Sequence, residues 1–503
     1  MDNKITRRQA LARTSVALGG ALLGGLATSL ARAAAAGTPL NRPNILFMLA
    51  DDWSWQGSES TDQLGLRMPT LARMQRAGVT FENAFVASPT CTASRGAILS
   101  GRWPWRLEEG ANLASILPQH FPLYTDLLES SGYYVGMTRK GWAPGQLGPA
   151  GRKRNPAGNA YSDFNTFLYK RPADRPFCFW FGSDDPHRPY NKGIGIKSGI
   201  DPATITVPPY LPDTPEVRSD IADYRYSLER FDLEAGLLLD RLERDGELAN
   251  TLVIMTGDNG WPFPRGKATL YDAGSHVPLV AMYPAKIPGG RVSKALISTV
   301  DLAATFLDVA GVAKPASMDS QTLMPLLAAG GDGPRRFVLA GRERHMDGAE
   351  VPLQAYASRS IRTAQYLYIR NFFPERWPAG APGHRPVTRQ QLENDFFAAY
   401  PDIDYGPTKA VMVLGQDDQK IAPLLKLATG KRPPAELYDV AADPYQLSNL
   451  MGQPQLKAVV AQLDQALLAE LRRTGDPRVG KPGDIFDHYP SYSDPGFGRP
   501  DDF

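Results

Sequence analysis

Two apolar runs that end in acidic residues constrain the fold of this chain more than any other feature. Residues 44–50 read Asn-Ile-Leu-Phe-Met-Leu-Ala and are followed by two aspartates, and residues 251–256 read Thr-Leu-Val-Ile-Met-Thr and are followed by Gly-Asp-Asn. A strand that is apolar at nearly every position is buried on both faces, which is typical of a sheet covered by helices. The two runs therefore predict an α/β fold whose strand ends carry oxygen-bearing side chains.

Helical and extended patterns alternate around these runs. In residues 215–246, apolar residues recur in steps of four and three, which places them on one stripe of a long helix, and Gly246 marks its end. Shorter helices are expected at 69–78 and 122–132, and further strands at 133–137, 177–181 and 279–283. Alternating strands and helices indicate a layered α/β domain, which we place at residues 37–335.

The pattern changes after residue 335. Short antiparallel strands are expected at 336–340, 355–358 and 360–371, and a helix at 455–473. We interpret residues 336–480 as a smaller α+β subdomain and residues 481–503, which are rich in proline and aspartate, as an irregular tail. A chain of 503 residues, 43% of them hydrophobic, is long enough to bury a core in each part.

The first 36 residues are typical of a twin-arginine signal peptide. Arg7 and Arg8 precede an apolar run rich in alanine, glycine and leucine at residues 16–30, and small residues follow it. The alternative is a membrane anchor, but the run is short and only mildly hydrophobic. The sequence therefore predicts export by the twin-arginine machinery to the periplasm or the medium, without a stable membrane anchor.

The charge balance gives no support for a nucleic-acid partner. Lys and Arg total 55 against 53 for Asp and Glu, a net charge of +2. Such a balance does not supply the basic surface by which proteins attract nucleic acids or anionic membranes. The charge balance therefore gives no support for a role on nucleic acids or membrane surfaces that is driven by charge.

Four residues at the two predicted strand ends offer oxygen ligands. They are Asp51, Asp52, Asp258 and Asn259. Ligands of an α/β sheet bind beyond the carboxyl ends of its strands, so these two pairs can meet although they are far apart in sequence. Each pair alone is better explained by capping of turns or helices. Together, three carboxylates and an amide favour a hard cation, Ca²⁺ or Mg²⁺, over zinc.

Cationic and proton-donating residues gather in glycine- and proline-rich turns. They are Arg95, Lys140, His187, Lys267 and His276. A single lysine or histidine is more often a solvated surface group. Five of them in loops expected at one sheet edge indicate a pocket for an anion, and with a metal they could stabilise a tetrahedral oxyanion during group transfer.

The chain has two cysteines, and their surroundings differ. Cys178 lies in the apolar stretch Phe-Cys-Phe-Trp-Phe and is expected in the core. Cys91 lies in a small, polar turn, where a buried structural thiol would be unusual. In an exported protein a Cys91–Cys178 disulfide is the alternative, and otherwise Cys91 has a chemical role.

Residues 91–102 resemble the signature of the type I sulfatases, C-x-P-S-R with a downstream T-G-R. The stretch reads Cys-Thr-Ala-Ser-Arg-Gly-Ala-Ile-Leu-Ser-Gly-Arg, with Ala93 in place of the family's proline and Ser100 in place of its threonine. In that family a formylglycine-generating enzyme oxidises the cysteine to Cα-formylglycine. The resemblance therefore implies that Cys91 is the modified residue and the precursor of the nucleophile.

The resemblance extends over nearly the whole chain beyond the signal peptide. Residues 42–52 and 256–260 match the family's two metal-binding segments, and residues 436–450 match the close of its C-terminal subdomain. Residues 258–271 look most like the sulfamidase (heparan N-sulfatase-like) branch. The resemblance implies the alkaline-phosphatase-like fold of sulfatases, a large mixed sheet flanked by helices with a smaller C-terminal α+β subdomain.

The resemblance also implies a role for each matched residue. Arg95 and Lys140 would hold the oxygens of formylglycine and sulfate. Lys267 would bind the sulfate, and His187 would assist the leaving group. One calcium ion would lie among Asp51, Asp52, Asp258, Asn259 and residue 91.

Two positions depart from the family and leave questions open. The family places a histidine at Trp142, so the group that polarises the second hydroxyl of the nucleophile is not identified. The family places an arginine at His276, which we therefore expect on the substrate side of the site.

The residues after the signature could bind the sugar. Trp103, Trp105 and Arg106 follow it closely enough to line the pocket, where indole faces would stack on sugar rings and arginine would bind sulfate or uronate. Ordinary packing is the alternative for all three.

The sequence thus predicts a sulfatase acting on sulfated carbohydrates. The branch resemblance favours N-sulfated glucosamine in heparin or heparan sulfate, while O-sulfates of other polysaccharides stay open. Two other functions stay open: a phosphatase or phosphonate monoester hydrolase of the same superfamily, and a non-catalytic binder of sulfated glycans with an unmodified Cys91.

Overall fold

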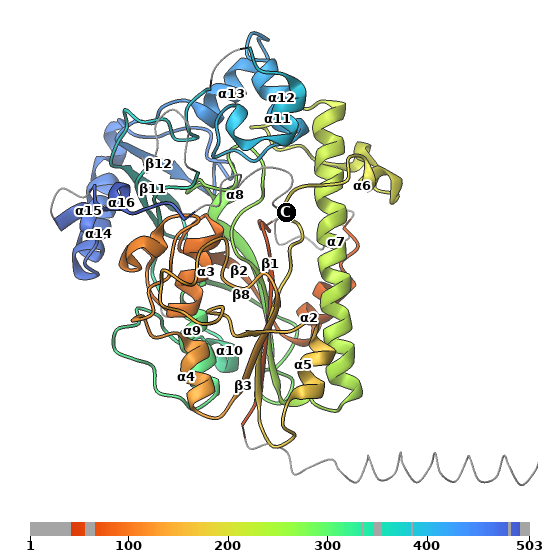
Figure 1. Cartoon of the computed structure of the whole chain (residues 1–503). Helices are drawn as coiled ribbons and strands as arrows, with labels where there is room; N and C mark the ends of the chain where they lie inside the picture. The colour runs from red at the N-terminus through yellow and green to blue at the C-terminus, as the bar shows by residue number, and fades with distance from the viewer. Residues whose placement is uncertain are drawn as a thin grey trace, which may run out of the picture.

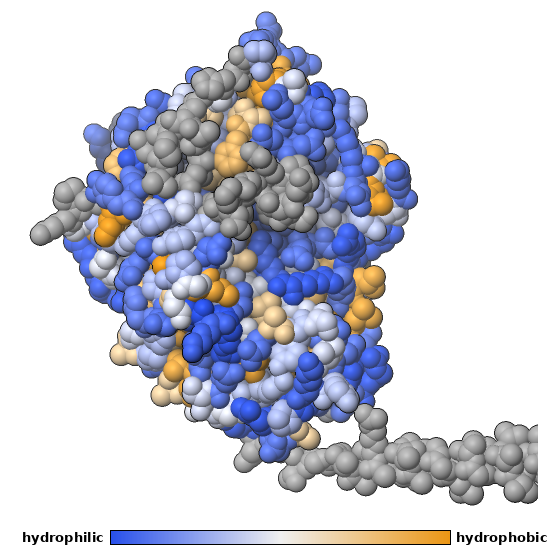
Figure 2. Space-filling model, in the orientation of Figure 1, coloured by the Kyte–Doolittle hydropathy of each residue, from blue (hydrophilic) through white to orange (hydrophobic). Residues whose placement is uncertain are grey.

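The computed structural model of the protein describes residues 42–55, 66–333, 335–346, 355–383, 386–480 and 484–492. Within them a large sheet lies between two layers of helices, and a smaller sheet with its own helices packs beside it (Figure 1). The predicted fold class, a mixed sheet flanked by helices with a smaller α+β part, is confirmed. On the side shown in Figure 2 most of the described surface is hydrophilic, and hydrophobic residues form only small, separate patches.

Among the described residues, the large sheet has eight strands. They are β1 (Asn44–Ala50), β2 (Val79–Phe85), β3 (Tyr134–Arg139), β4 (Asn159–Ala160), β5 (Phe177–Gly182), β6 (Thr251–Gly257), β7 (His276–Met282) and β8 (Arg291–Ser298). Their order is β4-β3-β5-β1-β6-β7-β2-β8. All neighbouring pairs are parallel except the two pairs made by β7, which is antiparallel to β6 and to β2.

Strand β1 shows why its sequence is apolar without alternation. Ile45, Phe47 and Leu49 pack in the core on one face of the sheet. Leu46 and Met48 pack in the core on the other face. Both faces are covered, so every side chain of the strand is buried.

Helices cover both faces of the large sheet (Figure 1). One layer contains α3 (Cys91–Ser100), α4 (Tyr124–Ser130), α9 (Asp301–Val309) and α10 (Met324–Ala329). The other contains α2 (Pro69–Ala77), α5 (Phe164–Lys170) and the long α7 (Pro215–Arg244). The apolar stripe of α7 is buried as predicted, and Asp232 on the same helix accepts hydrogen bonds from the backbone of Thr70 and Leu71 at the start of α2.

The smaller sheet has four antiparallel strands. They are β9 (Val338–Arg342), β10 (Ser358–Arg362), β11 (Tyr366–Asn371) and β12 (Ala435–Asp439), in the order β12-β11-β10-β9. Helix α14 (Lys457–Arg473), predicted at 455–473, packs against β10 and β11. The remaining α-helices are α6 (Ile194–Lys197), α8 (Asp272–Ser275), α11 (Arg389–Asn394), α12 (Pro407–Leu414), α13 (Ala422–Thr429), α15 (Pro477–Gly480) and α16 (Ile485–His488).

Some predicted elements differ from the structure. The strand expected at 360–371 is two strands, β10 and β11, joined by a tight turn. Thr363 makes that turn, because its N–H donates to the carbonyl of Tyr366 at 2.9 Å and its hydroxyl accepts from the Tyr366 N–H at 2.9 Å. Of the strand expected at 355–358, only Ser358 is extended in a sheet, since the Ala355 N–H bonds to the Asp487 carboxylate instead.

The two ends of the chain are described only in part. The predicted signal peptide at residues 1–36 lies outside the described residues. The described part of the predicted irregular tail contains α16, whose Phe486 is 1% exposed and accepts a hydrogen bond from Asn112 at 3.0 Å. Among the described residues, no helix is both long and apolar enough to cross a bilayer.

Candidate active site

The carboxyl ends of β1 and β6 meet at one edge of the large sheet. The strands are parallel neighbours, with Ala50 opposite Gly257. Asp52 therefore lies beside Asp258, and its backbone N–H donates to Asp258 Oδ1 at 3.0 Å. Asp52 has a φ of 72°, a left-handed conformation that aspartate tolerates better than most residues. The structure thus brings together the two acidic pairs that the sequence singled out.

Cys91 is the first residue of α3 and is buried against the acidic side chains. Its Sγ lies 3.4 Å from Asp51 Oδ1 and 4.0 Å from Asp52 Oδ1, and Asn259 Nδ2 is 3.6 Å away. Burial and the charge of Asp51 raise the pKa of the Cys91 thiol well above its usual value. The unmodified thiol is therefore uncharged and a weak nucleophile.

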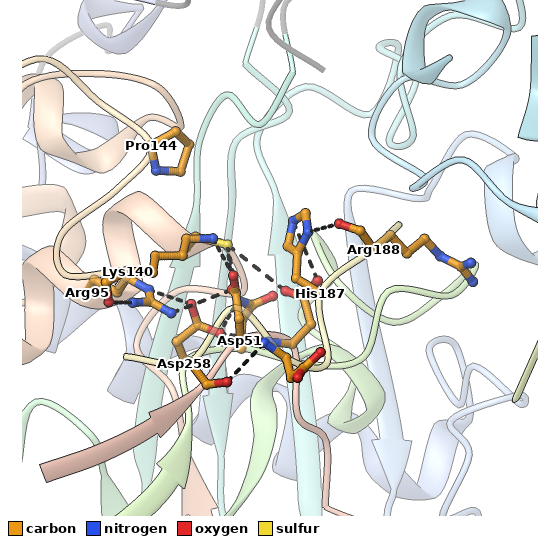
Figure 3. Close-up of polar contacts among 12 residues, drawn as sticks. Asp51, Arg95, Lys140, Pro144, His187, Arg188 and Asp258 are labelled. Carbon is orange, nitrogen blue, oxygen red and sulfur yellow. Dashed lines mark hydrogen bonds and ion pairs between the residues drawn. The ribbon is translucent and has the colours of Figure 1, made fainter. Parts of the chain in front are cut away.

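Two cations neutralise the acidic side chains next to Cys91 (Figure 3). Arg95 follows one helical turn after Cys91, and its Nε donates to Asp258 Oδ2 at 2.7 Å. Its Nη1 donates to the carbonyls of Lys140 and Gly141 at 2.7 and 2.8 Å, which fixes the loop after β3. The Lys140 ammonium group in that loop pairs with Asp51. Arg95 is thus held between two loops by acceptors on both sides of its guanidinium.

A second group of charged residues surrounds Asp52. Lys267 Nζ is 2.9 Å from Asp52 Oδ2 and 3.5 Å from Asp404 Oδ2. His187 Nε2 is 3.9 Å from Asp52 Oδ2, and its Nδ1 lies 2.5 Å from the carbonyl oxygen of Arg188. Because a carbonyl only accepts, Nδ1 carries a proton and Nε2 faces the site. Burial and Lys267 lower the pKa of His187 to about 3, so the imidazole is neutral before a ligand binds.

An ion pair anchors the loop that carries His187. Arg188 donates from Nη1 and Nη2 to the two carboxylate oxygens of Asp220 on α7, at 2.7 and 2.8 Å. Both side chains are buried. Such a bidentate pair fixes the position of the loop. Sequence reasoning did not single out Arg188 or Asp220, because their pairing depends on how the loop packs on the helix.

The acidic cluster fits a divalent cation. Ligand atoms of Asp51, Asp52, Cys91 and Asp258 all lie within 4.8 Å of one another. Burial raises the pKa of Asp52 and of Asp258, whereas Lys140, His187 and Arg95 outweigh burial and lower the pKa of Asp51. Asn259 Oδ1 is buried without a hydrogen-bond partner in the described part of the chain. Carboxylate and amide oxygens in this crowded arrangement are ligands typical of Ca²⁺ or Mg²⁺.

A cavity of about 600 Å³ opens onto this cluster. The smaller α+β region contributes His345 and Asp404 to its wall, and both are buried. Sequence reasoning missed these two residues, although a pair of aspartates in the largely apolar stretch 400–405 was a possible signal. Of the residues predicted for the site, the cavity is lined by Asp51, Cys91, Lys140, His187 and Lys267.

The structure does not bring the predicted sugar-binding tryptophans to this cavity. Trp103 and Trp105 are each 2% exposed and stack on each other in the core. Trp105 Nε1 donates to Thr474 at 3.0 Å, and Arg106 pairs with Asp319 at 2.6 Å. Substrate binding by these residues is therefore not supported, because the segment after α3 packs against β9 of the smaller sheet and does not line this cavity. Both indoles are packed in the core, as the alternative interpretation expected.

His276 also lies outside the cavity that contains Cys91. Its ring stacks between Trp55 and Phe85, with centroid distances of 5.4 and 4.5 Å, and its Nε2 bonds to the Glu82 carbonyl at 2.7 Å. It borders a separate cavity of about 750 Å³. His276 thus contacts β2 and does not line the cavity that contains Cys91, and its expected place on the substrate side stays a prediction.

The structure also shows where Trp142 lies and whether Cys91 and Cys178 form a disulfide. Trp142, at the position of the family's histidine, is 1% exposed and packs in the core. Cys91 and Cys178 are both free and buried, so the disulfide alternative is wrong. Cys178 lies in β5 as an apolar core residue, as predicted.

Comparison with known proteins agrees with this geometry. The family model described as Sulfatase matches residues 43–312, and that described as N-sulphoglucosamine sulphohydrolase, C-terminal, matches residues 257–373. The chain is 26% identical over 513 residues to N-sulphoglucosamine sulphohydrolase of Homo sapiens, which covers 88% of this chain and 93% of that relative. It is 24% identical over 484 residues to an ulvan-active sulfatase of Formosa agariphila, which covers 86% and 76%.

Solved structures share the fold. One protein in complex with its substrate D-glucosamine-2-N,6-O-disulfate superposes with a TM-score of 0.60 at 18% identity, over 89% of this chain and 100% of that one. The Sulfatase family model spans residues 43–312, more than half of the 503 residues, and includes the acidic pairs and Cys91. The chain therefore belongs to the sulfatase family of hydrolases.

Proposed function

We propose that this sulfatase removes sulfate groups, carried on nitrogen or on oxygen, from sulfated carbohydrates such as glycosaminoglycan or other polysaccharide fragments. The observation that carries the proposal is the position of Cys91 Sγ, 3.4 Å from Asp51, in a cavity that Lys140 and Lys267 also line. The names of its relatives support saccharide substrates, since they include an N-sulphoglucosamine sulphohydrolase and an ulvan-active sulfatase.

Two groups would complete the site. Asp51, Asp52, Asp258 and Asn259, with residue 91, would hold one Ca²⁺, and Cys91 would carry Cα-formylglycine made by a formylglycine-generating enzyme. When present, the hydrated aldehyde supplies an oxygen nucleophile that the cation activates, and it can release sulfate again. The buried, uncharged thiol of Cys91 lacks both properties, which supports the need for the modification.

The chain's own residues bind and orient the sulfate group. The ammonium group of Lys140 pairs with Asp51 and that of Lys267 with Asp52, and both would neutralise sulfate oxygens. Arg95 holds the Lys140 loop through two carbonyls and so positions the Lys140 side chain. His187 presents Nε2 to the cavity, where it would deliver a proton to the departing atom once the bound anion raises its basicity.

Export is the second part of the proposal. The twin-arginine pattern at Arg7 and Arg8 and the apolar run after it support translocation of the folded protein to the periplasm or the medium. Export after folding also suits the modification of Cys91. The residue is 1% exposed in the folded protein, so the activating enzyme must reach it before folding and therefore before export.

Sulfate release tests the proposed function. The chain is co-produced with a formylglycine-generating enzyme, conversion of residue 91 is verified by mass spectrometry, and sulfate is measured by ion chromatography with N-sulfated and O-sulfated oligosaccharides. We expect release from at least one class. A fully converted protein that releases none would instead support a glycan-binding role, and faster release of phosphate than of sulfate from matched aryl esters would support a phosphatase.

A further inference from the structure

Asp404 carries a buried carboxylate that lacks hydrogen-bond donors. The residue is 5% exposed, and neither of its carboxylate oxygens has a hydrogen-bond partner within the described part of the chain. Lys267 Nζ is 3.5 Å from Asp404 Oδ2, but it is nearer to Asp52, at 2.9 Å. Burying a carboxylate without donors is unfavourable. A ligand that brings a donor to this position would therefore be favoured.

Asp404 lies beside His187 and Asp52. One carboxylate oxygen of Asp404, a ring nitrogen of His187 and a carboxylate oxygen of Asp52 lie within 4.8 Å of one another. The three residues are therefore neighbours, and Asp404 and His187 line the same cavity as Cys91. If His187 protonates the departing atom, as in the proposed function, Asp404 lies next to that atom as well.

We propose that Asp404 determines specificity by favouring sulfate carried on nitrogen over sulfate carried on oxygen. A sulfamate nitrogen bears a hydrogen that can donate to the Asp404 carboxylate. The bridging oxygen of a sulfate ester bears only lone pairs, which the same carboxylate repels. The inference rests on the proposed function, and it assigns the choice between N-sulfated and O-sulfated substrates to one residue.

The charge of the products also favours the N-sulfate. Hydrolysis converts R–NH–SO3⁻ and water into R–NH3⁺ and SO4²⁻: the S–N bond breaks, an S–O bond forms, and both protons of the water end on nitrogen. Hydrolysis of an ester, R–O–SO3⁻, instead gives neutral R–OH and SO4²⁻, and the second proton of the water passes to solvent. Only the sulfamate develops positive charge on the departing atom, and a carboxylate beside that atom stabilises it.

The test compares two matched substrates. kcat/KM is measured for glucosamine 2-N-sulfate and for glucosamine 6-O-sulfate with the converted, Ca²⁺-loaded wild type and with Asp404→Asn. We expect the wild type to prefer the N-sulfate. Asp404→Asn should lower kcat/KM on the N-sulfate by about 10- to 100-fold and on the O-sulfate much less, because one charged hydrogen bond is lost.

Two controls make the result specific. Asp184→Asn removes the same charge from an exposed position on the wall of the same cavity and should leave the ratio of the two kcat/KM values unchanged. Binding of the product glucosamine against N-acetylglucosamine, measured by calorimetry on the wild type, should favour the amine. This measurement needs neither turnover nor a folded Asp404 variant.

Three results would overturn the inference. One is a wild type that prefers the O-sulfate, and another is a wild type that binds both sugars equally. The third is an unchanged ratio of the two kcat/KM values in Asp404→Asn; if both values fall equally, Asp404 only positions Lys267. A wild type that releases no sulfate from any substrate would contradict the proposed function instead, so the two failures are distinguishable.

Discussion

Arg95 and Asp258 form an ion pair that is closed to solvent, with Arg95 Nε 2.7 Å from Asp258 Oδ2 and both side chains 0% exposed. The pair joins the first turn of α3 to the carboxyl end of β6. It therefore fixes the position of residue 91 relative to the acidic cluster. Removal of one partner of a buried pair leaves an uncompensated charge, whereas exposed pairs contribute little.

The first prediction concerns this pair. Arg95→Met should lower the free energy of unfolding by about 3–5 kcal/mol, because Asp258 then stays buried without its partner. Urea denaturation measures the loss. The matched control is Arg73→Ala, which breaks an exposed pair with Asp240 at 2.7 Å and should cost less than about 1 kcal/mol. Equal losses in the two variants would show that the Arg95 pair has no special structural role.

The two cysteines give a second prediction. Cys91→Ala should reduce sulfate release by at least about 10³-fold, as removal of a nucleophile does in other hydrolases. Cys178→Ala should keep most of the activity, since Cys178 lies in the core and its loss removes only a few buried atoms. Sulfate release and circular dichroism are measured on both variants. Activity that survives in folded Cys91→Ala would contradict the role of residue 91.

The parts of the site that could be predicted are those encoded in short segments. The apolar run of β1 and the aspartates after it lie within nine residues. This short segment therefore predicts the strand, its carboxyl end and the metal ligands that follow it. The same holds for β6 with Asp258 and Asn259. Parallel pairing of β1 with β6 then brings the two segments together without further information.

The parts that could not be predicted depend on how distant segments pack. Trp105 follows the signature closely, yet its direction is set by Thr474 and the smaller sheet. Asp404 enters the cavity from a region where no motif marks it. His276 was placed by analogy with the family's arginine, but its ring fills a stack between Trp55 and Phe85. Local sequence specifies none of these long-range contacts.

A third prediction concerns the metal. Ca²⁺ should raise the melting temperature of EDTA-treated protein by a few °C, because a cation that binds only the folded state stabilises it, by about 2.7 kcal/mol at 100 times its Kd. Differential scanning calorimetry measures the shift without any need for activity. Asp52→Asn, which removes one of the crowded carboxylates, should show a much smaller response. Identical melting with and without Ca²⁺ in the wild type would contradict a cation site.

The last prediction uses a buried lysine behind the cavity wall. Lys409 on α12 is 2% exposed, and its Nζ donates to the carbonyls of Phe396 and Ile403 at 3.0 and 2.9 Å. These bonds hold the segment that carries Asp404. Burial lowers the pKa of Lys409 to about 7, although the nearby carboxylates of Asp404, Asp395 and Asp402 oppose the shift.

The sign of the resulting pH dependence follows from proton linkage. Between pH 7 and the unfolded value near 10.5 the unfolded chain binds a proton at Lys409 that the folded protein does not, so stability rises with pH by up to about 1.4 kcal/mol per unit. Below pH 7 both states are protonated and the slope vanishes. Urea denaturation of the wild type and of Lys409→Met across this range isolates the effect as the difference between their slopes. Parallel slopes would mean that Lys409 stays charged in the folded state, and its two carbonyl bonds would then be those of an ammonium group.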